Sequence, residues 1–196
     1  MQSIDYYNQN GQKYIQDTLM ADMSGLLDKF SQYLLPKGKV LDLGCGSGRD
    51  SLWFEQQGYE VVAMDGSRAM VDYCKKIIKG PVIHNTFDDF HTDDFFDGIW
   101  ACASLLHVKR AHLSETISKF LKFLTPDGYF FMSFKLLDYD YEKEGRIFTN
   151  FTEKSLHHFL NQIPSIKIIE TILTQDVRQE RKDEGWISVI VCKQTS

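Results

Sequence analysis

The stretch Lys39-Val40-Leu41-Asp42-Leu43-Gly44-Cys45-Gly46-Ser47-Gly48-Arg49-Asp50 decides the fold of this chain. It begins with a short apolar run that is typical of a buried strand. Glycines then stand at alternate positions, and a polar segment compatible with a helix follows. Because glycine tolerates positive φ and has no Cβ, such a turn lets backbone N–H groups approach a ligand closely. The stretch therefore predicts a strand, a ligand-binding turn and a helix in succession.

Asp42 is the unusual residue of this stretch, because it places a carboxylate just before the first glycine. A turn that holds a pyrophosphate gains nothing from an anion there, whereas a turn that holds a ligand with an ammonium group does. A tight strand-to-helix turn without any ligand is the alternative that the residues leave open.

Composition limits the class of protein. The chain has 196 residues and a net charge of −5, which fits one compact domain, and no Lys/Arg-rich face stands out. That balance argues against a protein that follows a nucleic acid backbone. Four widely spaced cysteines show neither a Cys-x-x-Cys nor a His-x-His pattern, so we expect reduced thiols, a cytoplasmic protein and no metal site. No secretory signal or membrane-spanning run is visible.

The alternation of patterns along the chain predicts an α/β sandwich. We expect strands over residues 40–43, 60–64, 82–85, 95–104, 129–135, 166–174 and 186–193. Helices are expected in two pieces within 5–35, then over 49–57, 67–78 and 112–124, and after Thr152. Residues 126–128 are expected to form a tight turn, and 137–150 a long polar loop.

The segment Val40 to Gly48 resembles the first motif of the class I S-adenosylmethionine (SAM) methyltransferases. That resemblance implies a Rossmann-like, seven-stranded, mostly parallel sheet with an antiparallel last strand and helices on both faces. It further implies an N-terminal helical lid over residues 1–38 and a SAM-binding domain over residues 39–196. Tyr6, Tyr7 and Tyr14 of the lid are candidate contacts to cofactor or substrate, or else pack on the surface.

The same resemblance places the cofactor around the glycine turn. It implies that Asp42 favours the ammonium group of the cofactor, directly or through a water, and that backbone carbonyls of Gly44 and of the residues near Ala103 hold its methionine end. Asp65 stands at the end of the second strand, where an acid accepts hydrogen bonds from ribose hydroxyls, or where it merely forms a turn before glycine. The remaining candidate cofactor residues are Cys45, Gly46, Arg49, Gly66, Ser67, Met70, Ala103 and Ser104. Of these, Ser67 also suits a helix N-cap, and Met70 suits the core.

Recognition of adenine departs from the family pattern. Many members carry an acid just after the third strand, where this chain has Thr86. Either Asp88 replaces that acid, or backbone groups near Phe87 recognise the base while the Phe87 ring packs on it. A solvated loop is the alternative for the Asp88-Asp89 pair.

His107 follows the fourth strand, beside the position of the reactive methyl group in the family. An imidazole with an unperturbed pKa near 6.5 serves as a general base at neutral pH, or it orients a neighbour. The closest resemblance is to tellurite-resistance-type methyltransferases, which methylate oxyanions of tellurium and selenium. It implies that His107, Arg146, Arg178 and Arg181 face an anionic substrate. The alternative for Arg178 and Arg181 is that they only balance the charge of the neighbouring acids.

We therefore predict a SAM-dependent methyltransferase that yields S-adenosylhomocysteine and acts on a small, anionic acceptor. Expected partners are that acceptor alone, without nucleic acid or membrane, in a monomer or homodimer. One alternative is a SAM-binding module without turnover. Another is a nicotinamide-dependent oxidoreductase, which fits less well because Gly48 comes one place too early for Gly-x-Gly-x-x-Gly.

Overall fold

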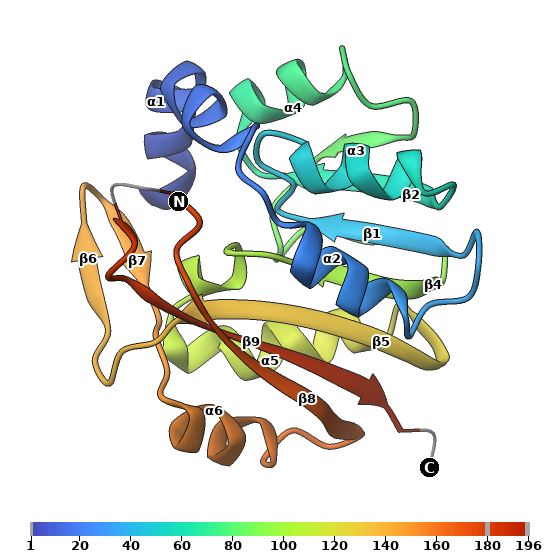
Figure 1. The fold of residues 1–196 in the computed structure, drawn as a ribbon, viewed down its shortest axis with the longest axis vertical. Coiled ribbons are helices and arrows are strands. Elements are labelled where there is room, and N and C mark those ends of the chain that lie inside the picture. The colour runs from blue at the N-terminus through green and yellow to red at the C-terminus, as the bar shows by residue number, and fades with distance from the viewer. Residues whose placement is uncertain (1, 179–180, 195–196) are drawn as a thin grey trace.

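One seven-stranded sheet forms the centre of the computed structural model (Figure 1). The structure describes residues 2–178 and 181–194. The strands of this sheet are β1 (Lys39–Leu43), β2 (Glu60–Asp65), β3 (Val82–His84), β4 (Phe96–Ala101), β5 (Leu124–Lys135), β8 (Ile166–Gln175) and β9 (Gly185–Lys193). They lie in the order β3-β2-β1-β4-β5-β9-β8. The pairs from β3 to β5 are parallel, and β9 is antiparallel to both of its neighbours. The predicted Rossmann-like sheet with an antiparallel last strand is confirmed.

Helices cover both faces of the sheet. They are α1 (Gln2–Thr18), α2 (Ser24–Ser31), α3 (Arg49–Gln56), α4 (Arg68–Cys74), α5 (Arg110–Leu121) and α6 (Glu153–Leu160), with a 3₁₀ turn η1 (Leu105–His107). Side chains of α2, α3 and α4 pack on one face, and those of α5 and α6 pack on the other. α1 instead lies next to α4 and β7, beyond the carboxyl ends of the parallel strands (Figure 1).

An aromatic cluster joins α2 to the sheet. Trp100 and Phe131 stack with ring centroids 3.8 Å apart, and Phe30 of α2 lies 5.4 Å from Trp100 and 6.0 Å from Phe131. All three side chains are fully buried. Within the predicted lid of residues 1–38, α2 therefore belongs to the core of the domain, and α1 is the part that reaches over the edge of the sheet.

The segment predicted as a polar loop over 137–150 contains a hairpin. Its antiparallel strands are β6 (Tyr141–Lys143) and β7 (Arg146–Phe148). Glu144 and Gly145 between them have φ values of 53° and 73°, as a two-residue turn with the twist of a hairpin requires. Tyr141 stacks on Phe148 at 4.7 Å. The loop prediction was wrong because charged residues hide a short strand pair whose stability comes from contacts with the rest of the molecule.

The strand β5 also begins earlier than predicted, at Leu124, so that the expected turn at 126–128 lies inside it. Asp127 there has a φ of 60°, and the pairing register with β4 shifts between Phe96 and Gly98. The turn residues thus form an irregularity in a strand rather than its boundary.

Phe30→Ala should lower the free energy of unfolding by about 3–5 kcal/mol, because it removes a fully buried ring between α2 and the sheet. Urea unfolding at neutral pH measures this. Leu35→Ala is the matched control, since Leu35 is 67% exposed and should change stability by less than about 0.5 kcal/mol. Equal effects of the two substitutions would contradict the place of α2 in the core.

Candidate active site

The glycine turn after β1 requires glycine at each of its alternate positions. Gly44, Gly46 and Gly48 have φ values of 80°, 53° and 75°, which side chains with a Cβ rarely adopt. A Cβ on Gly44 would lie 2.5 Å from Cβ of Ser104, so this position has no room for a side chain either. The N–H groups of Gly44 and Cys45 donate to the carbonyl of Met64 at 2.8 and 3.0 Å. These bonds fix the turn to the end of β2.

Asp65 ties this turn to the start of α4. One of its carboxylate oxygens accepts from the backbone N–H of Gly46 at 2.9 Å, and the other accepts from Ser67 at 2.7 Å. Burial raises the pKa of the Asp65 carboxyl, while these two bonds oppose that rise. Ser67 then caps α4 by accepting from the N–H of Met70. Asp65 therefore organises the end of the sheet, and its contact to a ribose stays a prediction.

A narrow cleft of about 80 Å³ opens above the glycine turn. Six of the predicted cofactor residues border this cleft, at the carboxyl ends of the strands or next to them: Gly44, Gly46, Asp65, Met70, Ala103 and Ser104. Ile4, Tyr7 and Tyr14 of α1 enter the cleft from above. A Cβ on Gly46 would lie 3.2 Å from the Tyr14 ring, and one on Gly66 would lie 2.7 Å from Ile4. The side chains of α1 therefore occupy space beside the glycine turn.

Two of the predicted cofactor residues lie beneath the turn rather than in the cleft. Asp42 is buried, and its carboxylate accepts from the hydroxyl of Ser51 in α3 at 2.5 Å. Burial, and then the charge of Asp50, raise the pKa of Asp42 above its usual value. Cys45 is buried as well, with its Sγ 3.9 Å from that of Cys74. A direct contact from Asp42 to an ammonium group in the cleft has no support in this arrangement.

The residues predicted near adenine lie beside the turn. The Phe87 ring is 3.7 Å from the position of a Cβ on Gly44, so it forms a wall next to the cleft. Thr86 is occupied locally, because its hydroxyl donates to the Asp89 carboxylate at 2.8 Å and accepts from the Asp89 N–H at 3.1 Å. Asp88 meets Lys119 through its backbone carbonyl, at 2.5 Å. Of the two hypotheses for adenine, the position of Phe87 favours the second, in which the Phe87 ring packs on the base.

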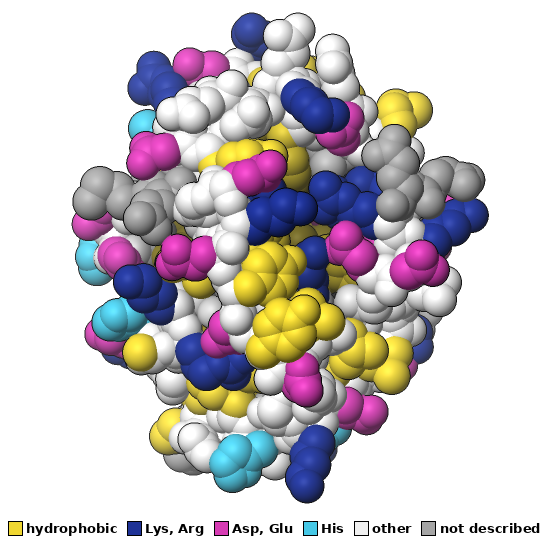
Figure 2. Space-filling model, turned by 90° about the vertical axis from the view of Figure 1, so that its left-hand side faces the viewer, with side chains coloured by type: hydrophobic (Ala, Val, Ile, Leu, Met, Phe, Trp, Pro, Cys, Tyr) yellow, Lys and Arg dark blue, Asp and Glu magenta, His cyan; other side chains and the backbone are white. Residues whose placement is uncertain are grey.

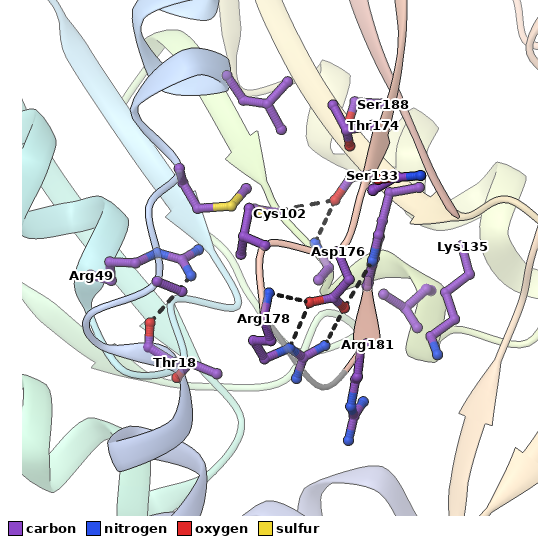
Figure 3. Close-up of a pocket in the computed structure, with 18 of the residues that line it drawn as sticks. Thr18, Arg49, Cys102, Ser133, Lys135, Thr174, Asp176, Arg178, Arg181 and Ser188 are labelled. Carbon is purple, nitrogen blue, oxygen red and sulfur yellow. Dashed lines mark hydrogen bonds and ion pairs between the residues drawn. The ribbon is translucent and has the colours of Figure 1, made fainter. Parts of the chain in front are cut away.

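A larger cavity of about 370 Å³ adjoins the cleft. Cys102, Ser133 and Ser188 of the sheet border it, and the connection between α1 and α2 borders it on one side (Figure 3). Six basic side chains border the cavity against only two acids, Asp22 and Asp176. The basic residues are Lys29, Arg49, Lys135, Arg146, Arg178 and Arg181. Figure 2 shows Lys and Arg side chains gathered around a hollow on this side of the molecule.

Most of these cations are paired with acids that stand outside the cavity. Lys135 bonds to Glu184 at 2.5 Å, Arg146 to Glu144 at 2.6 Å, and Arg49 to Asp50 at 2.6 Å. Arg178 is different, because its acid Asp176 also borders the cavity. Trp186 donates to the same carboxylate at 3.1 Å.

Arg181 is exposed and has no side-chain partner within residues 2–178 and 181–194. The predicted arginines thus do meet at one cavity, and Figure 3 shows Arg178 and Arg181 reaching it from the segment between β8 and β9, opposite Arg49. Their role toward a substrate remains a prediction.

Four residues border both the cleft and the larger cavity: Tyr7, Tyr14, Ala103 and His107. The Tyr7 hydroxyl lies 2.8 Å from Nε2 of His107, and Nδ1 of His107 lies 2.7 Å from the carbonyl oxygen of Ile147. Because a carbonyl only accepts, Nδ1 carries the proton, and Nε2 accepts from Tyr7. The two cavities therefore meet at an oriented Tyr7–His107 pair.

His107 is held in its neutral form. The pKa of His107 falls to about 4, mainly because the ring is buried. The hydrogen bond to Ile147 opposes this fall, and the charge of Arg146 adds to it. The expected titration near neutrality is therefore wrong for this environment. His107 remains a hydrogen-bonded orienter of Tyr7 in this geometry, with its accepting nitrogen already occupied.

The comparisons with known proteins agree with this geometry. A family model described as a methyltransferase domain matches residues 13–190, which is most of the chain. The chain belongs to this family. The assignment supports SAM as the cofactor and leaves the nicotinamide alternative without support.

Individual relatives of this methyltransferase-domain protein are distant. A curated protein described as an uncharacterized methyltransferase, from Staphylococcus carnosus (strain TM300), is 26% identical over 162 residues, which are 79% of this chain and 78% of that protein. Among solved structures, the Burkholderia thailandensis 1,6-didemethyltoxoflavin-N1-methyltransferase with bound 1,6-didemethyltoxoflavin and S-adenosylhomocysteine superposes with a TM-score of 0.79 at 19% identity, covering 98% of this chain and 86% of that one.

TehB from Haemophilus influenzae superposes with a TM-score of 0.70 at 16% identity, over 95% of this chain and 67% of that one. At these identities the two structures show a shared fold.

Several residues that border the larger cavity were not predicted from the sequence. Ser133 and Lys135 point to the same face of β5, and Ser188 of β9 pairs directly with Ser133. The sequence did carry one signal: Ser133 and Lys135 are two residues apart, so they lie on the same face of an otherwise apolar strand. Only strand pairing shows that they border one cavity.

Two further features are absent from the described part of the chain. None of its helices combines the length and apolarity that crossing a bilayer demands. Among the same residues, no cluster of His, Cys, Asp and Glu side chains has metal-binding geometry.

We expect wild-type stability to fall as pH drops from 7 to 5, because the unfolded His107 titrates at about 6.5 and the folded one at about 4. In that window the unfolded state binds more protons, so the His107 contribution is present above pH 6.5 and is lost toward pH 4. The loss specific to His107 should amount to about 2 kcal/mol at pH 5.

Urea unfolding of wild type, His107→Gln and His158→Gln at both pH values isolates this contribution. His158 is exposed and serves as the control. The His107→Gln protein should lose less stability than the other two between pH 7 and pH 5. Parallel losses in all three would argue against a neutral buried imidazole.

Proposed function

We propose that this protein transfers a methyl group from SAM to a small, anionic acceptor. The observation that carries the proposal is the wall shared by the two cavities, where Tyr7, Tyr14, Ala103 and His107 border both. A cofactor in the cleft and an acceptor in the larger cavity would meet at these four residues, which are the ones that the two cavities share in the described structure. Methyl transfer needs such a meeting of two reactants in fixed alignment.

The residues around the cleft fit the cofactor. The glycine turn offers a surface without side chains, Asp65 is an acceptor at the end of β2, and Phe87 supplies an apolar wall. When bound, SAM supplies an electrophilic methyl group. At about 80 Å³ the cleft is smaller than the ~300 Å³ at which ligand pockets usually begin. We infer that the side chains of Ile4 and Tyr14, which crowd the glycine turn from α1, rearrange when the cofactor enters, while Tyr7 keeps its bond to His107.

The character of the larger cavity supports the acceptor class. Six basic residues border the cavity against two acids. Five of the six are ion-paired, and Arg181 is the one without a side-chain partner among the described residues, so the lining offers arginine and lysine donors to an anion rather than a large uncompensated charge. About 370 Å³ is at the lower end of the range for organic ligands. The Burkholderia thailandensis neighbour, whose own ligand is the small molecule 1,6-didemethyltoxoflavin, is consistent with a small acceptor.

The chain's own contribution is mainly positioning. Ser133 accepts from the N–H of Ala103 at 2.7 Å and so fixes the loop at the shared wall. Ser104 donates to the carbonyl of Leu43 at 2.6 Å and holds the same loop against the glycine turn. The connection between α1 and α2 forms one border of the cavity through Ala21, Asp22 and Met23.

The alternative of a SAM-binding module without turnover predicts a different result. In that case S-adenosylhomocysteine binds, but no acceptor is methylated. The proposed enzyme should both bind the cofactor and convert it. Oligomeric state and cytoplasmic location remain predictions from the sequence.

Asp65→Asn should weaken the binding of S-adenosylhomocysteine about tenfold or more, because the charged acceptor of hydrogen bonds is lost and the amide NH2 faces the N–H of Gly46 or Ser67, which also loosens the turn. Calorimetric titration with S-adenosylhomocysteine, and with NADH in parallel, measures this. Asp72→Asn is the control, because Asp72 pairs with Arg68 on the exposed side of α4. Wild-type binding of NADH in place of S-adenosylhomocysteine would overturn the proposed function.

A further inference from the structure

Arg146 brings an unused hydrogen-bond donor to the region where the two cavities meet. Its side chain is only 12% exposed, and the Nε atom is buried without a hydrogen-bond partner among the residues that the structure describes. The guanidinium group is fixed, because it donates to Glu144 at 2.6 Å and lies 3.6 Å from the Tyr6 ring centroid. A buried N–H without an acceptor costs about 1–3 kcal/mol, so the fold keeps this donor at a cost.

This donor lies beside the shared wall. The centre of the Arg146 guanidinium is 6.0 Å from the ring centroid of Tyr7, which borders both cavities. Through its charge and a side-chain hydrogen bond, Arg146 opposes the rise that burial causes in the pKa of Tyr7, and its charge lowers the pKa of His107; Nε is the atom that stays without a partner. An acceptor group that meets the cofactor's methyl at this wall is therefore within the field of Arg146.

Few groups are available there to remove a proton from an acceptor. The Nε2 atom of His107 already accepts from Tyr7, and its Nδ1 carries a proton toward Ile147. The cations Arg146 and Lys135 oppose the addition of a further positive charge at the imidazole. An amine, alcohol or neutral thiol must lose a proton when it is methylated, whereas an acceptor that is already ionised needs no base.

We propose that the acceptor is an organic carboxylic acid, that Arg146 holds its carboxylate at the shared wall, and that the product is a methyl ester. This inference rests on the proposed function and names its substrate class. A carboxylate is ionised at neutral pH, and arginine matches its planar pair of oxygens. One carboxylate oxygen forms the new bond to the methyl carbon, and the bond from that carbon to sulfur breaks with its electron pair left on sulfur. The negative and positive charges cancel, and no proton moves.

The rest of the cavity suits the body of such an acid. Phe148 and Trp186 provide apolar walls, and Ser188 places a buried hydroxyl without a hydrogen-bond partner in the described structure at the border of the cavity. An inorganic oxyanion would fill only a small part of about 370 Å³ and would leave the Ser188 hydroxyl unsatisfied. The structure therefore favours an organic acid with a second polar group over the oxyanions of the tellurite-resistance type.

The test uses the full-length protein and SAM labelled with ¹⁴C in its methyl group. The acceptors are a panel of aromatic and aliphatic mono- and dicarboxylic acids, each beside its primary amide, together with a protein-free cell extract of low molecular mass. Methyl esters release volatile [¹⁴C]methanol in mild alkali, whereas methylated amines, thioethers and ethers do not. We expect most of the transferred label to be volatile, and the acids to be methylated at least tenfold faster than their amides.

Binding without cofactor gives a second readout. Calorimetry with the best acid should show at least tenfold weaker binding to Arg146→Gln than to wild type, with Arg146→Lys between them because it keeps the charge. Arg68→Gln, on the exposed side of α4, should bind the acid as wild type does. The affinity for S-adenosylhomocysteine should be the same in all four proteins.

The outcomes separate the two proposals. Alkali-stable label or equal methylation of acids and amides would overturn the ester inference and leave methyl transfer standing. No transfer to any acceptor in spite of bound S-adenosylhomocysteine would favour the module without turnover and would overturn both proposals. Weaker binding of S-adenosylhomocysteine to Arg146→Gln would assign Arg146 to the cofactor and would also overturn it. A protein that binds no S-adenosylhomocysteine would instead remove the proposed function itself.

Discussion

The bonds that Asp65 makes are the constraint on which the site depends. Its carboxylate accepts from Gly46 in the turn after β1 and from Ser67 at the start of α4, so two segments from neighbouring strands are fixed at one edge. α1 then packs on this edge: Asn8 accepts from the hydroxyl of Ser67 at 2.9 Å. The position of α1 sets that of Tyr7, and through it the hydrogen bond to His107.

A second constraint is the balance of charge around the larger cavity. Its cations are kept close together by acids such as Glu184, Glu144 and Asp50, which bond to them from outside the cavity. Such pairing lowers the repulsion between like charges without filling the cavity with carboxylates. The result is a cavity lined by guanidinium and ammonium groups in a chain whose net charge is −5. Composition alone pointed only to the acidic average, since averages carry no information on position.

The sheet and the glycine turn were predictable because they rest on local patterns. A buried parallel strand needs a continuous apolar run, and a turn at positive φ needs glycine, so both leave marks in the sequence itself. The β6–β7 hairpin could not be predicted from a local pattern. It is held by the stacking of Tyr141 on Phe148 and by the contacts of these two rings with distant elements of the core. The irregular start of β5 was missed for the same reason, because Asp127-Gly128 reads locally as a strand boundary.

By itself, the sequence determined the fold class, the place of the cofactor turn, and the residue types that could serve there. Tertiary structure decided which of them meet. In the folded chain the Asp42 carboxylate accepts from Ser51, and both carboxylate oxygens of Asp65 accept from backbone N–H groups. The fold also places Arg146 beside Tyr7. It also moved the pKa of His107 to about 4 through burial. The physical reason is that hydrogen-bond partners and desolvation come from segments far apart in the chain, which no local pattern records.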